Sequence, residues 1–229
     1  ILGGCTYVLN KTSGQIYEQM SQMAQLYAQE LDNRFLRISR NLFSTIMDTN
    51  ETNSTFWGNV NLMKNGDYSE YAIGKLREEY FSSAWEYGTE YRIFLYTHDT
   101  DKLYQLSLSS DGNYTMSSDI AASIREQIDK LDEKTYAVKR KWDVLECDDE
   151  VYICKIAQKN GIALGCIVNV KSILEPFSKL SLGKYGYVSL VDQDEVCIGM
   201  LDQSGIISEP QSMNTKNTYT CLLYTSPSP

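Results

Sequence analysis

The chain has little of what metal and nucleophilic chemistry require. Its 229 residues include one histidine, His98, and six cysteines, none of them in a CxxC pair. Zinc, iron–sulfur and haem sites are therefore not indicated. The G-x-S-x-G element, the Walker loop and the H-E-x-x-H motif do not occur either. We predict no catalytic residue, no metal and no cofactor, so this region is not expected to be an enzyme.

Positive charge is also scarce. The formal net charge is −9 and the sequence pI is about 4.7. The only local basic cluster is residues 139–141 (Lys-Arg-Lys), which is short enough for a solvated strand face. Nucleic-acid binding needs clustered Lys and Arg, so nucleic acid is not an expected partner. Hydrophobic residues make up 42% of the chain, enough for a real core.

No uncharged apolar run is long enough to span a bilayer, which takes about 20 residues. The first nine residues, ILGGCTYVL, are uncharged and mostly apolar. We interpret residues 1–11 as the end of a truncated transmembrane segment, with a simple apolar N-terminus as the alternative.

The last nine residues, CLLYTSPSP (221–229), match in frame the translation of a transposase sequencing adapter, TGT CTC TTA TAC ACA TCT CCG AGC CCA. We interpret them as an assembly artefact that takes no part in the fold.

A long amphipathic helix is the strongest pattern present. From residue 13 to about residue 47, apolar residues recur every three or four positions, as on one stripe of a helix. No proline interrupts the run, which would extend about 50 Å at 1.5 Å per residue. We assign residues 12–48 to a signalling and dimerisation helix. The predicted stripe is Ile16, Met20, Met23, Tyr27, Leu31, Phe35, Ile38, Leu42 and Ile46.

The rest of the chain alternates short strands with helices. After a polar stretch from residue 48, a second helix is expected at 68–87 and a third at 118–131, capped by Ser117 or Ser118. Period-2 patterns predict strands at 91–97, 103–108, 136–145, 150–158 and 162–170. Asp148-Asp149 and Asn160-Gly161 supply hairpin turns. A short helix at 171–180 and a strand–turn–strand unit near 186–199 follow. This order predicts an α+β fold with antiparallel strands.

The cysteines leave an alternative open. Cys154 and Cys166 fall on neighbouring predicted strands, so they form either a disulfide or two buried free thiols.

This arrangement resembles the extracytoplasmic Cache sensor domains, which have a PAS-like five-stranded sheet, and most closely the double-Cache region of bacterial sensor histidine kinases. The resemblance covers residues 12–200 and lies in the long helix, the segment 136–170 and the segment LSLGKYGYVSLVDQDEVCIG. That last segment resembles the opening of a second Cache module, with Asp194-Glu195 in place of the usual Asp-Gly turn. It contains Gly183, Gly186, Tyr187, Val188, Leu190, Val191 and Asp192.

The resemblance implies a domain organisation. Residues 49–182 would form a membrane-distal PAS-like sensor domain, and residues 183–220 the truncated start of a membrane-proximal one. The N-terminal part of the helix would form the seam of a homodimer, for which we nominate Ile16, Met20, Met23, Tyr27 and Leu31.

A ligand site is expected on the strand at 136–145. The amino-acid-sensing branch of the family has an Arg-x-Trp-Tyr element, and this chain has Arg140-Lys141-Trp142 followed by Asp143. Strand alternation places Tyr136, Arg140 and Trp142 on one face, where rings and a guanidinium suit a small polar ligand. Tyr152, on the next strand, completes the predicted set. The alternative is that Trp142 belongs to the core and Arg140 reaches solvent.

The resemblance therefore implies the extracytoplasmic ligand-sensing region of a membrane receptor that binds a small extracellular molecule, such as an amino acid or a sugar. Its full-length parent would be a two-component histidine kinase, a chemoreceptor or a membrane-anchored transcriptional regulator. Two alternatives remain: a secreted or surface-anchored small-molecule- or carbohydrate-binding module without signalling output, and a hydrolase with an acid/base pair in a pocket.

Overall fold

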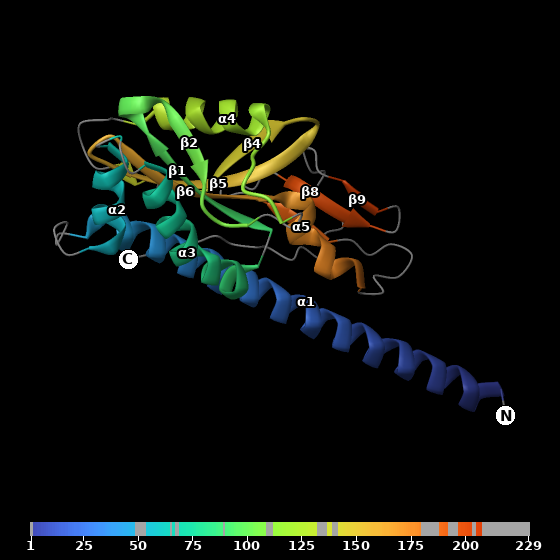
Figure 1. The fold of residues 1–229 in the computed structure, drawn as a ribbon. Helices are drawn as coiled ribbons and strands as arrows, with labels where there is room; N and C mark the ends of the chain where they lie inside the picture. Colours follow the sequence, from blue (N-terminus) through green and yellow to red (C-terminus); the bar gives the residue numbers. More distant parts are fainter. Residues whose placement is uncertain are drawn as a thin grey trace. The chain divides into compact units, whose positions relative to one another are not determined.

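The computed structural model describes residues 2–48, 54–64, 66, 69–88, 90–108, 112–131, 137–138, 142–179, 188–191, 197–202 and 205–207. The chain forms two compact units. The smaller unit consists of residues 1–33 and 171–224, and the larger one is built from residues 34–170. The described elements confirm an α+β fold with an antiparallel sheet, helices and a small second sheet (Figure 1).

Helix α1 is the longest element and spans Leu2–Met47, 46 residues. The predicted end at residue 47 is confirmed, whereas the helix begins about ten residues earlier than the pattern predicts. Among the described residues, no helix combines the length and the apolarity needed to cross a membrane. The predicted stripe is confirmed from residue 31 onward, where its members are buried: Leu31, Phe35, Ile38, Leu42 and Ile46.

The predicted dimer seam stays a prediction. The side chains of Ile16 and Met20 lie outside the described residues, and Met23 is 46% exposed. Leu31 is buried within the single chain, and the ring of Tyr27 lies 5.5 Å from that of Phe177 in an edge-to-face arrangement. Two of the five nominated residues thus already pack within one copy.

The larger unit is organised around one antiparallel sheet. Its strands run in the order β2-β1-β6-β5-β3, and β4 also pairs with β5, so six strands fill five positions. They are β1 (Tyr91–Thr97), β2 (Lys102–Gln105), β3 (Ala137–Val138), β4 (Asp143–Cys147), β5 (Glu150–Lys159) and β6 (Ile162–Asn169). A 3-10 turn, η1 (His98–Thr100), connects β1 to β2.

The expected strand at 136–145 is the main error in the strand prediction, because it is two strands, β3 and β4. Val138 pairs with Ala157, and Asp143 pairs with Cys154. Four residues lie between Val138 and Asp143, whereas only two residues of β5 lie between their partners, Cys154 and Ala157. The register with β5 therefore differs by two residues between β3 and β4.

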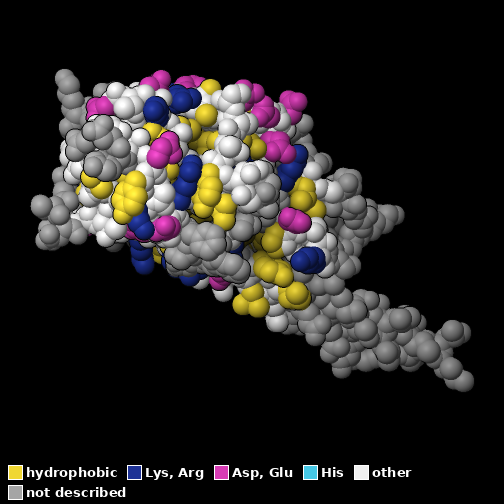
Figure 2. Space-filling view, in the orientation of Figure 1, with side chains coloured by type: hydrophobic (Ala, Val, Ile, Leu, Met, Phe, Trp, Pro, Cys, Tyr) yellow, Lys and Arg dark blue, Asp and Glu magenta, His cyan; other side chains and the backbone are white. Residues whose placement is uncertain are grey.

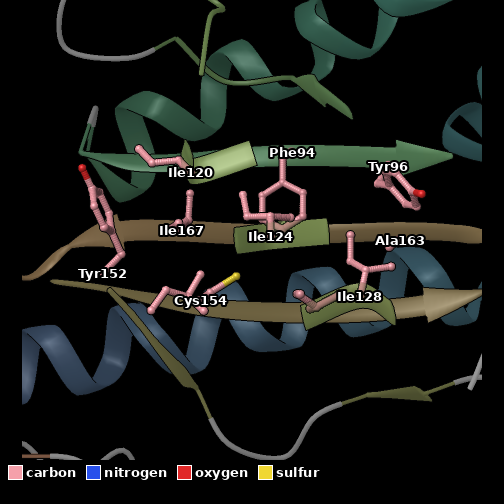
Figure 3. Close-up of a cluster of buried hydrophobic side chains, with 11 residues drawn as sticks. Phe94, Tyr96, Ile120, Ile124, Ile128, Tyr152, Cys154, Ala163 and Ile167 are labelled. Carbon is pink, nitrogen blue, oxygen red and sulfur yellow. The ribbon is translucent and has the colours of Figure 1, made fainter. Parts of the chain in front are cut away.

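One face of this sheet is covered by helix α4 (Ser118–Asp129), which begins at the predicted cap, Ser117. The Ser117 hydroxyl accepts a hydrogen bond from the backbone N–H of Ile120, at 3.3 Å. Figure 3 shows the side chains of α4 over those of β1, β5 and β6 in one buried apolar cluster. The cluster consists of Phe94, Tyr96, Ile120, Ile124, Ile128, Leu145, Tyr152, Cys154, Ile156, Ala163 and Ile167.

The opposite face of the sheet is covered by α1 from Arg34 onward, by α2 (Thr55–Lys64) and by α3 (Ser69–Tyr87) (Figure 1). The ring of Phe35 lies 6.0 Å from that of Tyr91 at the start of β1. The prediction of α3 is confirmed, and Ala72, Leu76 and Tyr80 of its stripe are buried. Helix α2 was not predicted, because the polar run before it indicated only turns and caps.

Both predicted hairpin turns are confirmed. Asn160 and Gly161 have φ of 54° and 72°, and Asp148 and Asp149 have φ of 55° and 57°. Left-handed geometry at both central residues is that of a two-residue type I′ turn, which matches the twist of the flanking strands.

The cysteine alternatives are resolved in favour of free thiols at Cys154 and Cys166. Cys154 pairs with Ile167, and Cys166 pairs with Lys155. The two sulfur-bearing residues therefore sit one register step apart and face opposite sides of the sheet, a geometry that no disulfide bridges.

The smaller unit contains the remaining elements. Helix α5 (Val170–Leu174) leads into η2 (Glu175–Lys179), as predicted for 171–180. A three-stranded antiparallel sheet follows, with the order β7 (Val188–Val191), β8 (Cys197–Asp202) and β9 (Gly205–Ile207). The first two strands match the predicted strand–turn–strand unit, whereas β9 falls where only polar loop was expected. Gly183, Gly186, Tyr187 and Asp192 lie outside the described residues.

Replacing Gly165 with alanine tests the packing of the central strands. A Cβ on Gly165 would stand 2.7 Å from the backbone oxygen of Lys155 and would also clash with the ring of Phe94. Because a backbone atom cannot move aside cheaply, we expect Gly165→Ala to lower the free energy of unfolding by about 1–3 kcal/mol. Urea unfolding measures the effect.

Gly74→Ala is the matched control for that substitution. Gly74 lies on α3, and a Cβ there would meet nothing within 4 Å. The change is expected to raise the free energy of unfolding by about 0.5–1 kcal/mol through helix propensity. Equal losses from the two substitutions would contradict the packing described for Gly165.

Asp32 on α1 gives a pH-dependent prediction. Its Oδ1 is buried and has no hydrogen-bond partner among the described residues, and burial raises the pKa of its carboxyl from 3.8 to about 6. The folded chain therefore favours the protonated acid. The stability that this preference contributes is present below pH 3.8 and is lost as the pH rises through about 6.

We expect Asp32→Asn to be more stable than the wild type at pH 7, and the difference to vanish at about pH 4. Urea unfolding at both pH values tests this expectation. Glu146→Gln, at an exposed position of β4, controls for the loss of one negative charge. A difference that is the same at both pH values would contradict the assignment to Asp32.

Candidate ligand-binding site

The structure separates the residues predicted to bind a ligand. Tyr136 and Arg140 lie outside the described residues. Trp142 is half-buried and its ring lies 4.7 Å from that of Phe35 on α1. Tyr152 is only 6% exposed and belongs to the cluster beneath α4. Trp142 and Tyr152 therefore face opposite sides of the sheet, and the structure does not bring them together.

The hairpin register explains this separation. Leu145 pairs with Tyr152 and shares its face. Trp142 precedes Leu145 by three positions, an odd number, so alternation turns its side chain to the side of α1. For Trp142 the structure agrees with the alternative that it is a packing residue.

A polar cluster surrounds Tyr152 at the end of the sheet where β5 begins and β6 ends. The Tyr152 hydroxyl donates to Oε2 of Glu150 at 2.9 Å, and Nδ2 of Asn169 donates to the same oxygen at 2.6 Å. We call Glu150, Tyr152 and Asn169 the Glu150 cluster. One carboxylate oxygen thus organises two donors from two adjacent strands.

Strand geometry brings these three side chains together. Glu150 and Tyr152 are two positions apart on β5 and so share a face, and Asn169 pairs directly with Tyr152 across the β5–β6 ladder. Arg92 on β1 pairs with Ile167 of the α4 side, so it faces the same side near the same end. Figure 3 shows Tyr152 at one end of the apolar cluster, beside Ile120, and Tyr96 at the other.

The electrostatic environment keeps the Tyr152 hydroxyl a donor. Burial raises the pKa of Tyr152, the bond from Asn169 opposes that shift, and the neighbouring Glu150 carboxylate raises the pKa further. The protonated phenol then donates to the carboxylate in a charge-assisted hydrogen bond. The cluster thus offers a negative oxygen, an amide and a ring at the rim of an apolar core, with the Arg92 guanidinium close enough to lower the pKa of Tyr152.

The opposite face holds a different titratable group. Lys155 is 5% exposed and pairs with Cys166, one position beyond Cys154 on β5. Burial lowers the pKa of Lys155 to about 8, and the Asp143 carboxylate partly offsets that effect. This amine lies on the face of the sheet opposite α4 and is not part of the Glu150 cluster.

A second polar group lies on the α4 side of the sheet at the other end, where β1 ends. The Tyr96 hydroxyl donates to Oδ1 of Asp101 at 3.0 Å, and Arg125 of α4 pairs with the same oxygen at 3.3 Å. His98 lies 3.4 Å from Oε1 of Gln158. The Asp101 side chain is 73% exposed, so solvent competes for it, and this network ties α4 to the β1–β2 connection. Figure 2 shows acidic side chains gathered along the border formed by α4.

Metal binding finds no support in the described part of the chain, where no group of three or more His, Cys, Asp or Glu side chains converges. The exposed Asp148 carboxyl, on the hairpin turn, has its pKa raised by a hydrogen bond to Asp119 in the first turn of α4, so these two acids form a solvated pair.

Comparison of the chain with protein-family models, with curated proteins and with solved structures finds no match.

Sequence reasoning identified Tyr152 but not Glu150 or Asn169. The pattern Glu-x-Tyr at the start of a buried strand is the available signal, because two polar groups recur there with period 2 in an otherwise apolar run. Asn169 could not be paired with Tyr152 without the register of the β5–β6 hairpin.

Removing the Tyr152 hydroxyl tests the geometry of the cluster. Tyr152→Phe deletes one charge-assisted bond and keeps the ring, so we expect the free energy of unfolding to fall by about 1–2 kcal/mol. Tyr71→Phe, at a tyrosine that is 59% exposed on α3, is the control and should change little. Thermal and urea unfolding provide the comparison, and equal effects at both positions would contradict a structured Glu150 cluster.

Proposed function

We propose that this chain is the extracytoplasmic ligand-sensing region of a transmembrane signal-transduction receptor of the Cache type, with a two-component sensor histidine kinase as its full-length parent. The observation that carries the proposal is the antiparallel sheet with five strand positions between α4 and the continuous helix α1. The Cache family has a PAS-like sheet of five strands preceded by a long helix. In this proposal β7, β8 and β9 begin a second, membrane-proximal PAS-like unit.

The proposed binding face is the α4 side of the sheet, at the Glu150 cluster. A small polar molecule needs a few placed polar groups beside apolar contact area. Glu150 and Asn169 supply the polar groups, and the partly buried Cys147, which pairs with Glu150 and packs against the apolar cluster, lies beside them. The proposed ligand is a small extracellular metabolite, such as an amino acid or a sugar.

The proposed output is a change in how α1 packs. A ligand shifts an equilibrium between two packings only by the difference between its affinities for them. Phe35 and Arg34 hold α1 on the sheet: Arg34 forms a 3.1 Å ion pair with Glu90, and its guanidinium lies 5.5 Å from the Tyr91 ring centroid. This anchoring supports a role for α1 as the element that carries the signal to a membrane-anchored homodimer.

Ligand binding tests the proposal directly. A thermal-shift screen of amino acids, amines and sugars, followed by calorimetry on any hit, should identify a compound that stabilises the chain. Ten-fold weaker binding in Glu150→Gln and Tyr152→Phe, with near wild-type binding in Trp142→Phe, is the expected pattern. The reverse pattern would move the site to the α1 side, and no hit across the three classes would count against a sensor of such metabolites.

A long-read sequence of the genomic locus tests the receptor context. A complete membrane span upstream of Ile1, with a second span and kinase motifs downstream of Thr220, is the expected result. A stop codon following a genuine CLLYTSPSP, without spans, would favour the secreted or surface-anchored binding module.

A further inference from the structure

The β4–β5 hairpin connects the two functional faces of the sheet. Its turn, Asp148-Asp149, leads straight into Glu150 of the Glu150 cluster, on the side of α4. At the far end of the same hairpin, Trp142 immediately precedes β4 and packs on Phe35, on the side of α1. Five consecutive cross-strand pairs join these two ends, from Asp143–Cys154 to Cys147–Glu150.

We infer that this hairpin is a coupling element, which transmits the state of the Glu150 cluster to helix α1 through the contact between Trp142 and Phe35. The inference rests on the proposed function, since it assigns a route from the proposed binding face to the proposed output helix. In it, Trp142 is a positioning residue and does not touch the ligand.

The hairpin is suited to move as one piece. β4 is hydrogen-bonded to β5 but lies off the main strand path, and its register with β5 differs by two residues from that of β3. The type I′ turn fixes the register at the other end, because both of its residues are left-handed. Glu150 is the first residue of β5 and pairs with Cys147, the last residue of β4, so a change at the Glu150 side chain acts on β4 directly at the turn.

The contact between Trp142 and Phe35 would be sensitive to a movement of β4. Phe35 is 2% exposed, and it touches both Trp142, at 4.7 Å and 60°, and Tyr91, at 6.0 Å and 71°. Tyr91 belongs to β1, which lies inside the sheet between β2 and β6, whereas Trp142 immediately precedes the edge strand β4. Displacing only the Trp142 ring changes the packing around Phe35. One aromatic contact of this kind changes an equilibrium constant by about 2- to 10-fold.

Hydrogen exchange in a double-mutant cycle tests the inference on the full chain without a ligand. Glu150→Gln perturbs the cluster, and exchange is followed in peptides covering residues 34–47 of α1, with α3 peptides as the reference for global opening. We expect Glu150→Gln to speed α1 exchange at least three-fold relative to α3. Glu146→Gln, the same change at an exposed position of the same hairpin, should leave the ratio unchanged.

The decisive comparison is the same change in a Trp142→Leu background. There Glu150→Gln should no longer alter α1 exchange, although it still alters exchange at the start of β5. Trp142→Phe serves as the background if the leucine variant does not fold, and the effect should then be partial. An unchanged α1 ratio in the wild-type background, or an equal effect in both backgrounds, overturns the inference.

Failure of the coupling and failure of the proposed function are distinguishable. A ligand that binds Trp142→Leu and the wild type equally, without the expected exchange pattern, would keep the sensor and remove the hairpin route. The expected exchange pattern, combined with a thermal-shift screen in which no compound binds, would keep the route and remove the proposed sensor.

Discussion

The central strands β5 and β6 must bury both of their faces, and the rest of the larger unit depends on that constraint. Their residues are buried almost without interruption from Val151 to Gln158 and from Ala163 to Val168. Two layers of helices are therefore required, with α4 on one side and α1, α2 and α3 on the other. Gly165 allows this close packing, because the Phe94 ring of the neighbouring strand occupies the place where a Cβ would stand. Polar side chains on the α4 side are then confined to the strand ends, where the helix no longer covers the sheet.

Periodicity was enough to predict most of the elements. The ends of β1, α3 and α4 agree with the predicted ones to within two residues, because their apolar spacing changes sharply at turn residues and caps. The split between β3 and β4 escaped prediction, since an even number of additional residues leaves the alternation intact. Helix α2 escaped for another reason: its buried residues, such as Phe56 and Val60, follow a run of polar turn formers that hides where a helix begins. In both cases the local sequence pattern was compatible with more than one structure, and tertiary packing determined which one formed.

The candidate site shows the same limit at the level of single residues. Alternation fixes which residues of one strand share a face, but it does not say which face of the next strand they meet. That relation comes from register, and register comes from the length and geometry of the turn. The two-residue turn at Asp148-Asp149 pairs Leu145 with Tyr152, and this pairing sends Trp142 to the other side. Tyr152 was therefore correctly placed on the neighbouring strand, whereas a shared pocket with Trp142 was not a consequence of the sequence pattern.

The separation of the two faces constrains any mechanism of sensing. The sheet lies between the Glu150 cluster and the contact of Trp142 with Phe35 on α1, so a small molecule held at the cluster does not touch that contact. Its effect has to pass through the strands. The central strands resist displacement, because each is hydrogen-bonded on both sides and buried on both faces. The edge strand β4 pairs with β5 and carries few buried side chains. Less interaction free energy opposes its movement than opposes movement of β5 or β6, so the edge of the sheet, and not its core, is where binding and helix packing are most readily linked.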